Sequence, residues 1–315
     1  MRGMAWRRPA LQMALLAGGC ILTPAVGAAQ VAAADPGTAC SHKFQKAASN
    51  VGPYTFRTYE DTKDGDACLL VQQRGKEIFR RTFGNHGRFT LGQAGNADLK
   101  TPPIANGTDI TGRGQPDMII AFYTGGAHCC LMHYVFELTP EFRLLATLDA
   151  GGGDRAHFSP IDRGYYYFAN DWNFAYWNTS FTESPAPDVI LRFVDDPKVR
   201  GYHLALDKMT RPAPNRQDWA RASVEATQAF ADDSPFSGGT GSKLWGNMLE
   251  LIYSGHSDLA WKFFDEAWPA KRPGKDKFLA DFCSQLATSS YWPDLDKTLV
   301  NRPPACVNAK PEEAR

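Results

Sequence analysis

The distribution of apolar residues divides the chain into a strand-rich part and a helical part. Between residues 50 and 206, short aromatic or β-branched runs alternate with turns rich in Gly, Pro, Asn and Asp, which is typical of short antiparallel strands. The predicted strands span residues 54–59, 68–73, 78–83, 118–123, 131–138, 142–148, 165–170 and 189–194. This pattern favours a partial propeller, a sandwich or a barrel.

The apolar period changes after the Pro-rich segment 211–215, which we interpret as a linker. Beyond it, apolar residues recur at about i, i+4 and i+8, the period of amphipathic helices, and Gly, Pro or Ser residues separate the stretches. The predicted helices span residues 219–230, 244–253, 259–268 and 278–286. The sequence therefore predicts an α+β fold, with a β-rich domain over residues 35–210 and an α-helical domain of antiparallel helix pairs over residues 211–315.

One predicted helix pair has the spacing of a tetratricopeptide repeat. Gly255, Ala260, Phe264 and Ala267 match its small and aromatic positions. Gly255 would permit a tight turn, Ala260 would let two helices approach closely, and Phe264 would fill the space between them. A single repeat cannot bury its own faces, so we expect one helix hairpin packed on the β domain rather than a binding array.

Residues 1–34 are interpreted as a secretory signal peptide. Arg2, Arg7 and Arg8 precede an apolar run over residues 11–22, and small residues follow it. The run is too short and too rich in glycine to span a membrane. Cys20 follows an Ala-Gly-Gly segment that loosely resembles a lipoprotein cleavage box, so lipid anchoring through Cys20 is an alternative. We predict a periplasmic or secreted protein without a transmembrane span.

The charge balance argues against nucleic acid as a partner. The chain has 34 basic and 34 acidic residues, and loss of the three leader arginines leaves a net charge of about −3. A chain with this charge and no run of Lys or Arg has no strong electrostatic attraction to nucleic acid or anionic lipid.

The cysteine count indicates disulfides. An even number of cysteines in an exported chain is typical of a disulfide framework, and six follow the leader: Cys40, Cys68, Cys129, Cys130, Cys283 and Cys306. Proximity favours Cys40–Cys68 and Cys283–Cys306. The adjacent pair Cys129 and Cys130 leaves three alternatives open: a vicinal disulfide, a soft-metal site with His128 and His133, or two separate partners. We favour the disulfide, because the spacing matches no standard zinc site.

Two resemblances follow from these motifs. Residues 109–120, DITGRGQPDMII, resemble the loop and strand of FG-GAP/VCBS repeats, whose loop binds calcium. Over most of the mature chain, the segments TGGAHCC (residues 124–130), DWNFAYW (171–177) and SPAP (184–187) are similar to a family of secreted proteobacterial proteins. The second resemblance implies export and brings no activity with it.

The FG-GAP/VCBS resemblance implies a calcium loop. Calcium needs several oxygen ligands around one point, and Asp109, Thr111 and Asp117 match three of the ligand positions. Arg113 stands where the repeat has an acid, and a guanidinium can only donate hydrogen bonds. It would instead bridge Asp109 and Asp117 as an internal ion pair. We favour this metal-free turn over a degenerate Ca²⁺ site.

An aromatic cluster over residues 165–177 is the candidate ligand site. Exposed rings stack on sugars or peptides, and Asp171, Trp172 and Tyr176 are the residues we expect at such a site. The alternative, which we favour, is that these rings fill the faces of a sheet.

Catalytic motifs are scarce in the sequence. It contains neither a Gly-x-Ser-x-Gly elbow nor a His-Glu-x-x-His zinc helix. Asp149, Asp154 and Asp171 are candidates for an acid–base pair of glycoside hydrolysis. We predict an exported, non-catalytic binding or envelope-associated structural protein whose partner is an envelope protein or a glycan. The alternatives are a periplasmic hydrolase of glycan or peptidoglycan, and a protein-interaction adaptor that uses the helices.

Overall fold

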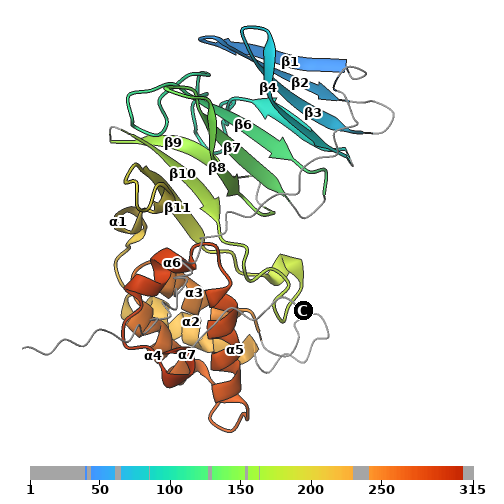
Figure 1. The fold of residues 1–315 in the computed structure, drawn as a ribbon. Coiled ribbons are helices and arrows are strands. Elements are labelled where there is room, and N and C mark those ends of the chain that lie inside the picture. Colours follow the sequence, from blue (N-terminus) through green and yellow to red (C-terminus); the bar gives the residue numbers. More distant parts are fainter. Residues whose placement is uncertain are drawn as a thin grey trace, which may run out of the picture. The chain divides into compact units, whose positions relative to one another are not determined.

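Three antiparallel sheets precede a group of helices (Figure 1). The structure, a computed structural model, describes residues 40, 44–60, 65–84, 86–126, 130–152, 155–162, 164–229 and 241–307. Residues Pro36–Arg315 form one compact unit, and every element below belongs to it. The predicted signal peptide, residues 1–34, lies outside the described residues. The α+β class predicted from the sequence is confirmed.

Each sheet consists of four consecutive strands that pair in sequence order. The first sheet contains β1 (Phe44–Val51), β2 (Tyr54–Glu60), β3 (Ala67–Gln73) and β4 (Lys76–Phe83). The second contains β5 (Arg88–Leu91), β6 (Asp117–Tyr123), β7 (Leu131–Glu137) and β8 (Arg143–Asp149). The third contains β9 (His157–Ile161), β10 (Gly164–Asn170), β11 (Asp188–Val194) and β12 (Gly201–Leu204). This is the strand order of a propeller blade, repeated along the chain.

Four of the observed strands, β1, β5, β9 and β12, were not predicted from the sequence, for physical reasons. The residues of β1 are exposed or half-buried along its whole length, so no apolar alternation marks it. β9 contains Pro160, a residue that sheets tolerate only at their edges, and β9 is an edge strand. β5 and β12 have only four residues each.

The second sheet is buried on both faces, because it packs between the other two. On one face, Met118 and Phe122 share a core with Phe56 of the first sheet. On the other, Ile119 and Val135 join the core formed by the third sheet and the helices. This double burial explains why the sequence of β6 is almost continuously apolar rather than alternating.

The helices follow the third sheet and are α1 (Leu206–Met209), α2 (Arg216–Ala229), α3 (Lys243–Tyr253), α4 (Ser257–Ala267), α5 (Lys275–Ala287), α6 (Trp292–Leu295) and α7 (Pro304–Val307). Two 3₁₀ helices, η2 (Phe181–Glu183) and η3 (Asp296–Thr298), complete the described elements. The long helices reproduce the four predicted ones apart from their ends. Within the described ranges, no helix has both the length and the apolar character needed to cross a bilayer.

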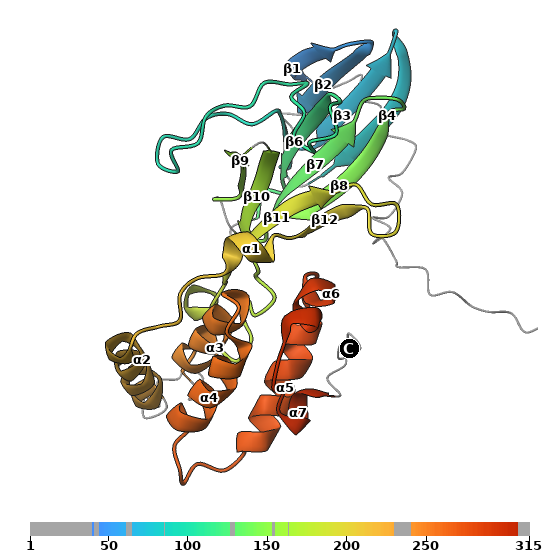
Figure 2. The same ribbon diagram turned by 90° about the vertical axis from the view of Figure 1, so that its left-hand side faces the viewer.

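The predicted helix hairpin is formed by α3 and α4, which lie side by side (Figure 2). Gly255 makes the turn with a φ of +87°, a conformation that L side chains rarely adopt. Ala260 and Phe264 are fully buried, as the repeat-like spacing implies. Trp261 and Trp268 are buried as well, so they do not form the exposed apolar face that an adaptor built on them would need.

Two disulfides are present among the described residues. Cys40 pairs with Cys68 of β3, and Cys283 of α5 pairs with Cys306 of α7, with Cα atoms 5.7 Å and 5.2 Å apart respectively. Both pairings are those predicted from proximity, and they are compatible with export to an oxidising compartment. Cys129 lies outside the described residues, so the predicted Cys129–Cys130 disulfide is not tested.

Candidate functional site

A polar cavity of about 230 Å³ lies where β8 and β10 end and where the chain leaves α5. Three distant segments build its wall, which consists of Asp149, Gly151, Asn170, Asp171, Trp172, Asn173, Ser290 and Tyr291. Asp171 and Trp172, two of the residues predicted to bind a ligand, are part of this wall. Asp149, which the sequence suggests only as a member of an acid–base pair, lies with them.

The Asp171 carboxylate is held by neutral donors from α3, from the segment after α5 and from its own loop. Its Oδ2 accepts hydrogen bonds from the Tyr253 hydroxyl of α3 and from Ser289 Oγ, the latter at 2.6 Å. Its Oδ1 accepts the backbone N–H of Asn173 at 2.9 Å. The residue is only 6% exposed. Burial, followed by the Asp171 charge, raises the pKa of Tyr253 well above its usual value, so the tyrosine remains a donor. Asp171 therefore anchors the third sheet to the helices beneath the cavity.

Trp172 forms an aromatic wall of the cavity. Its ring stacks on Phe181 of η2, with centroids 4.9 Å apart and planes at 7°. Its edge packs against Gly151, where a Cβ atom would collide with the indole. The indole Nε1 is buried and has no hydrogen-bond partner among the described residues. These contacts hold the ring rigidly in a cavity that also contains open hydrogen-bonding groups.

Tyr291 shares the cavity wall with both carboxylates. Burial is the largest cause that raises its pKa above the usual value, and the charges of Asp171 and Asp149 raise it further. Its hydroxyl consequently keeps its proton at physiological pH. Sequence reasoning missed Tyr291 because it lies 120 residues after Asp171, and no local motif connects the two positions.

Tyr176 lies outside the wall of the cavity. It is 59% exposed and has a φ of +61°, and its ring contacts Phe181 at a centroid distance of 5.5 Å. Its backbone N–H donates to Ser184 Oγ at 2.9 Å. The ring of Trp172 also contacts Phe181, but Tyr176 is not part of the cavity wall that Asp171 and Trp172 share.

The predicted calcium loop is filled by hydrogen bonds from its own backbone. Asp109 accepts the N–H groups of Arg113 and Gly114 at 3.0 Å and 2.7 Å. Asp117 Oδ2 accepts the N–H groups of Ile110 and Thr111 and also the Thr111 hydroxyl, at 2.7–3.1 Å. Few acceptor positions on these carboxylates remain for a cation.

The Arg113 guanidinium lies within the same cluster. It donates to Asp117 Oδ1 at 2.7 Å, to Thr111 Oγ1 at 2.8 Å and to Glu137 of β7. The residues present do not fit Ca²⁺, because a fixed positive charge lies among its presumed ligands. The geometry favours the internal ion pair, although the guanidinium bridges Asp117 to Glu137 rather than to Asp109. Glu137 was not expected from the sequence.

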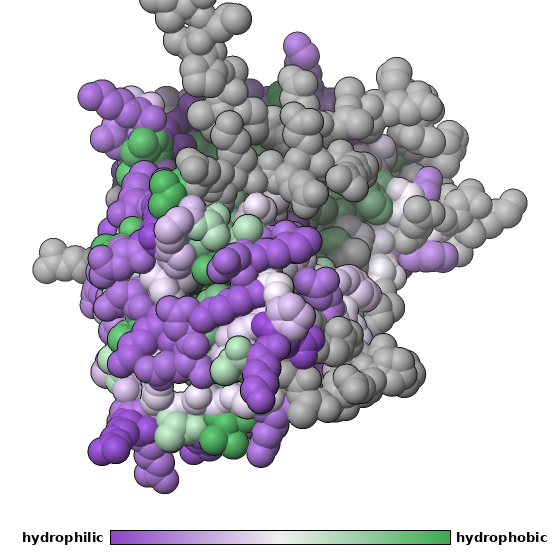
Figure 3. Space-filling view, turned by 90° about the horizontal axis from the view of Figure 1, so that it is seen from below, coloured by the Kyte–Doolittle hydropathy of each residue, from purple (hydrophilic) through white to green (hydrophobic). Residues whose placement is uncertain are grey.

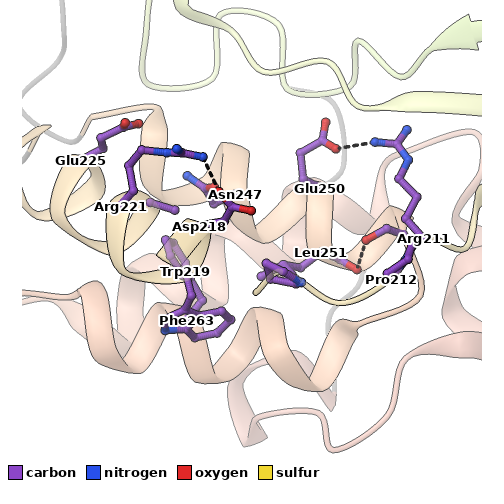
Figure 4. Close-up of a pocket in the computed structure, with 13 residues that line it drawn as sticks. Arg211, Pro212, Asp218, Trp219, Arg221, Glu225, Asn247, Glu250, Leu251 and Phe263 are labelled. Atoms are coloured by element: carbon purple, nitrogen blue, oxygen red, sulfur yellow. Dashed lines mark hydrogen bonds and ion pairs between the residues drawn. The ribbon is translucent and has the colours of Figure 1, made fainter. Parts of the chain in front are cut away.

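The helices enclose a second hollow of about 340 Å³, between α2 and the α3–α4 hairpin (Figure 4). Trp219, Leu251 and Phe263 contribute its apolar side chains. Its rim is charged, and Figure 4 shows two ion pairs there, Arg221 with Asp218 at 2.6 Å and Arg211 with Glu250 at 3.4 Å. The face of the molecule in Figure 3 is mostly hydrophilic, with small hydrophobic spots.

His133 is a buried histidine of the second sheet. Its Nδ1 lies 3.0 Å from the hydroxyl of Tyr167 in the third sheet, which places a polar contact inside the core between the two sheets. His128 and Cys129, which the alternative soft-metal interpretation combines with Cys130 and His133, lie outside the described residues. Among the residues that the structure describes, no group of three His, Cys, Asp or Glu side chains is arranged to hold a metal ion.

The stability of the protein is expected to fall in mild acid because of His133. Burial, with a smaller effect of His157, lowers the pKa of His133 from 6.5 to about 4. The unfolded chain takes up this proton near pH 6.5 and the folded chain only near pH 4, so the free energy of unfolding decreases as the pH falls through this interval. The loss reaches about 2–3 kcal/mol by about pH 4.5.

Urea titrations at neutral and acidic pH measure this effect. We expect the pH dependence to be much smaller in His133→Gln, which removes the titrating imidazole. His86→Gln, a change at an exposed histidine outside the core, is the matched control. Equal pH dependence in the wild type and in His133→Gln would rule out this assignment.

Comparisons with known protein families, with characterised proteins and with solved structures find no match to this chain. The two resemblances noted in the sequence therefore stay predictions.

Proposed function

We propose that this chain is an exported binding protein that holds a hydroxyl-rich ligand, a glycan fragment, in the cavity lined by Asp171 and Trp172. The observation that carries the proposal is a cavity whose wall combines a rigid indole ring with open polar groups. An aromatic ring takes the apolar face of a sugar, and converging polar groups take its hydroxyls.

The hydrogen bonding within the cavity supports binding rather than hydrolysis. Glycoside hydrolysis uses two carboxyl groups, one on each side of the scissile bond. Asp171 already accepts bonds from Tyr253, Ser289 and Asn173, which opposes its use as a nucleophile or base. Within the part of the chain that the structure describes, this leaves Asp149 as the only acid of the cavity wall that is open to a ligand. Asp154, the third candidate for an acid–base pair, lies outside the described residues.

The hollow between α2 and the α3–α4 hairpin supports a second candidate function, the adaptor. It offers an apolar floor and a charged rim to a segment of a partner protein. The charged groups of its rim are already paired with one another, which leaves fewer of them for a partner and makes it the weaker of the two sites.

Titration of the mature protein with oligosaccharides tests the proposed function. We expect Trp172→Ala to weaken binding by at least about tenfold, because the stacking surface is lost. The matched variant Trp172→Phe keeps a ring that can stack on Phe181, and we expect it to retain most of the affinity.

Trp219→Ala, in the helical hollow, is the control and should bind as the wild type does. Binding that withstands Trp172→Ala but is lost in Trp219→Ala would contradict the proposed site. Release of reducing ends from the oligosaccharide would instead indicate the hydrolase. Melting temperatures of the variants separate loss of binding from loss of folding.

A further inference from the structure

The wall of the cavity carries negative charge and no positive charge. Of its eight residues, Asp149 and Asp171 are acidic, and none is Lys, Arg or His. Two carboxylates that share a partly enclosed space create a negative potential, since the surrounding protein screens charge less than water does. Such a site attracts cations and repels anions.

Asp149 is the carboxylate that remains open to a ligand. Its Oδ1 accepts the N–H of Gly151 at 2.7 Å. Among the described residues, no group donates to its Oδ2. Because Asp149 is the last residue of β8 and is exposed, a ligand in the cavity can reach it from solvent. Asp171, in contrast, is buried and has donors on both oxygens.

The remaining groups of the wall suit a ligand that donates hydrogen bonds. Two aromatic residues, Trp172 and Tyr291, contribute to the wall beside the carboxylates, and an aromatic face attracts an ammonium group. The side-chain NH₂ group of Asn170 donates to Ala186 and Asp188, and that of Asn173 donates one of its two N–H groups to Gln285. Acceptors and hydroxyls therefore predominate among the groups left for a ligand.

We propose that the cavity selects glycans that carry a free amino group, and that Asp149 is the residue that determines this specificity by pairing with the protonated amine. This inference rests on the proposed function. Neutral sugars bind more weakly, because they lack the ion pair. Sugars that carry a carboxylate or a phosphate are repelled, since the wall offers them no cation.

Calorimetric titration at low salt and about pH 6, where the amine is protonated, tests the inference. The probes are the trimers of glucosamine, of N-acetylglucosamine, of glucose and of galacturonate. We expect the glucosamine trimer to bind about tenfold more tightly than the glucose and N-acetylglucosamine trimers, which corresponds to one ion pair of moderate strength. The galacturonate trimer should bind most weakly, and added salt should reduce the preference for the amine.

Two variants attribute the preference to one residue. Asp149→Asn keeps an oxygen that accepts the Gly151 N–H while it removes the charge, so the fold should persist and the preference should disappear. Asp98→Asn, a change at an exposed acid outside the cavity, should keep the preference. Melting temperatures confirm that both variants fold.

The outcomes separate this inference from the proposed function. If the glucosamine and glucose trimers bind equally well, or if Asp149→Asn keeps the preference, the amine specificity is wrong and glycan binding stands. If none of the trimers binds the wild type, both proposals fail.

Discussion

Replacing Glu137 with alanine is expected to lower the free energy of unfolding by about 3–5 kcal/mol. Glu137 is 2% exposed, and its carboxylate pairs with three arginines, Arg113, Arg143 and Arg200. The Arg113 side chain is almost as deeply buried, with 7% exposure. Loss of the carboxylate leaves this guanidinium in the protein interior with only part of its compensating charge, which is the costly way to break a buried ion pair.

Two further variants separate the charge of Glu137 from its shape and the buried ion pair from an exposed one. Glu137→Gln keeps the volume and removes the charge, so we expect most of the loss to persist. Arg143→Ala removes a partner whose side chain is 52% exposed, and we expect it to cost about 0–1 kcal/mol. Denaturant unfolding measures all three variants. A loss below about 1 kcal/mol in Glu137→Ala would show that water or neighbouring groups solvate Arg113 after the change.

Replacing Asp171 with alanine is expected to cost about 3 kcal/mol or more of unfolding free energy. The change leaves the hydroxyls of Tyr253 and Ser289 and the N–H of Asn173 without their acceptor, beneath the third sheet. Each buried donor without a partner costs about 1–3 kcal/mol. The contacts between β10 and the helices should weaken together, because these bonds join them.

Asparagine at position 171 tests the hydrogen-bonding explanation. Its side-chain amide has one oxygen, which can accept hydrogen bonds either from the two hydroxyls or from the N–H of Asn173. Its NH₂ group then points at the remaining donor and cannot accept a hydrogen bond from it. We therefore expect Asp171→Asn to be destabilising as well, though less than alanine. Asp188→Ala is the control, because its carboxylate is 66% exposed and pairs with Arg211 at the surface. It should change stability by less than about 0.5 kcal/mol. Equal effects at positions 171 and 188 would contradict the role given to Asp171.

Local sequence signals predicted most of the fold. Gly255, whose turn needs a positive φ, marks the boundary between α3 and α4 in the sequence and in the structure. The two confirmed disulfides join cysteines that are 28 and 23 residues apart, close enough for proximity to select the pairs. The missed strand β1 shows the limit of this approach, because a strand exposed along its length carries no apolar alternation.

The candidate site could be predicted only in part. Asp171 and Trp172 stand in a conspicuous aromatic segment, and the structure places both at the cavity. Tyr291 and Ser290 reach the same cavity from the segment after α5, a juxtaposition that depends on how the helices pack against the third sheet. Likewise, Glu137 meets Arg113 only because β7 pairs with β6, and the spacing of 24 residues gives no sign of it.

We assign the ligand site to the cavity at the end of β10, and oxidative footprinting of the protein is the sharpest test of this assignment. Hydroxyl radicals label exposed side chains, and a saturating mixture of the glucosamine and glucose trimers protects those that it covers. We expect protection of Trp172 and Tyr291, with Trp219 unchanged. Protection confined to Trp219 and the helical hollow, or no protection at all, would contradict it.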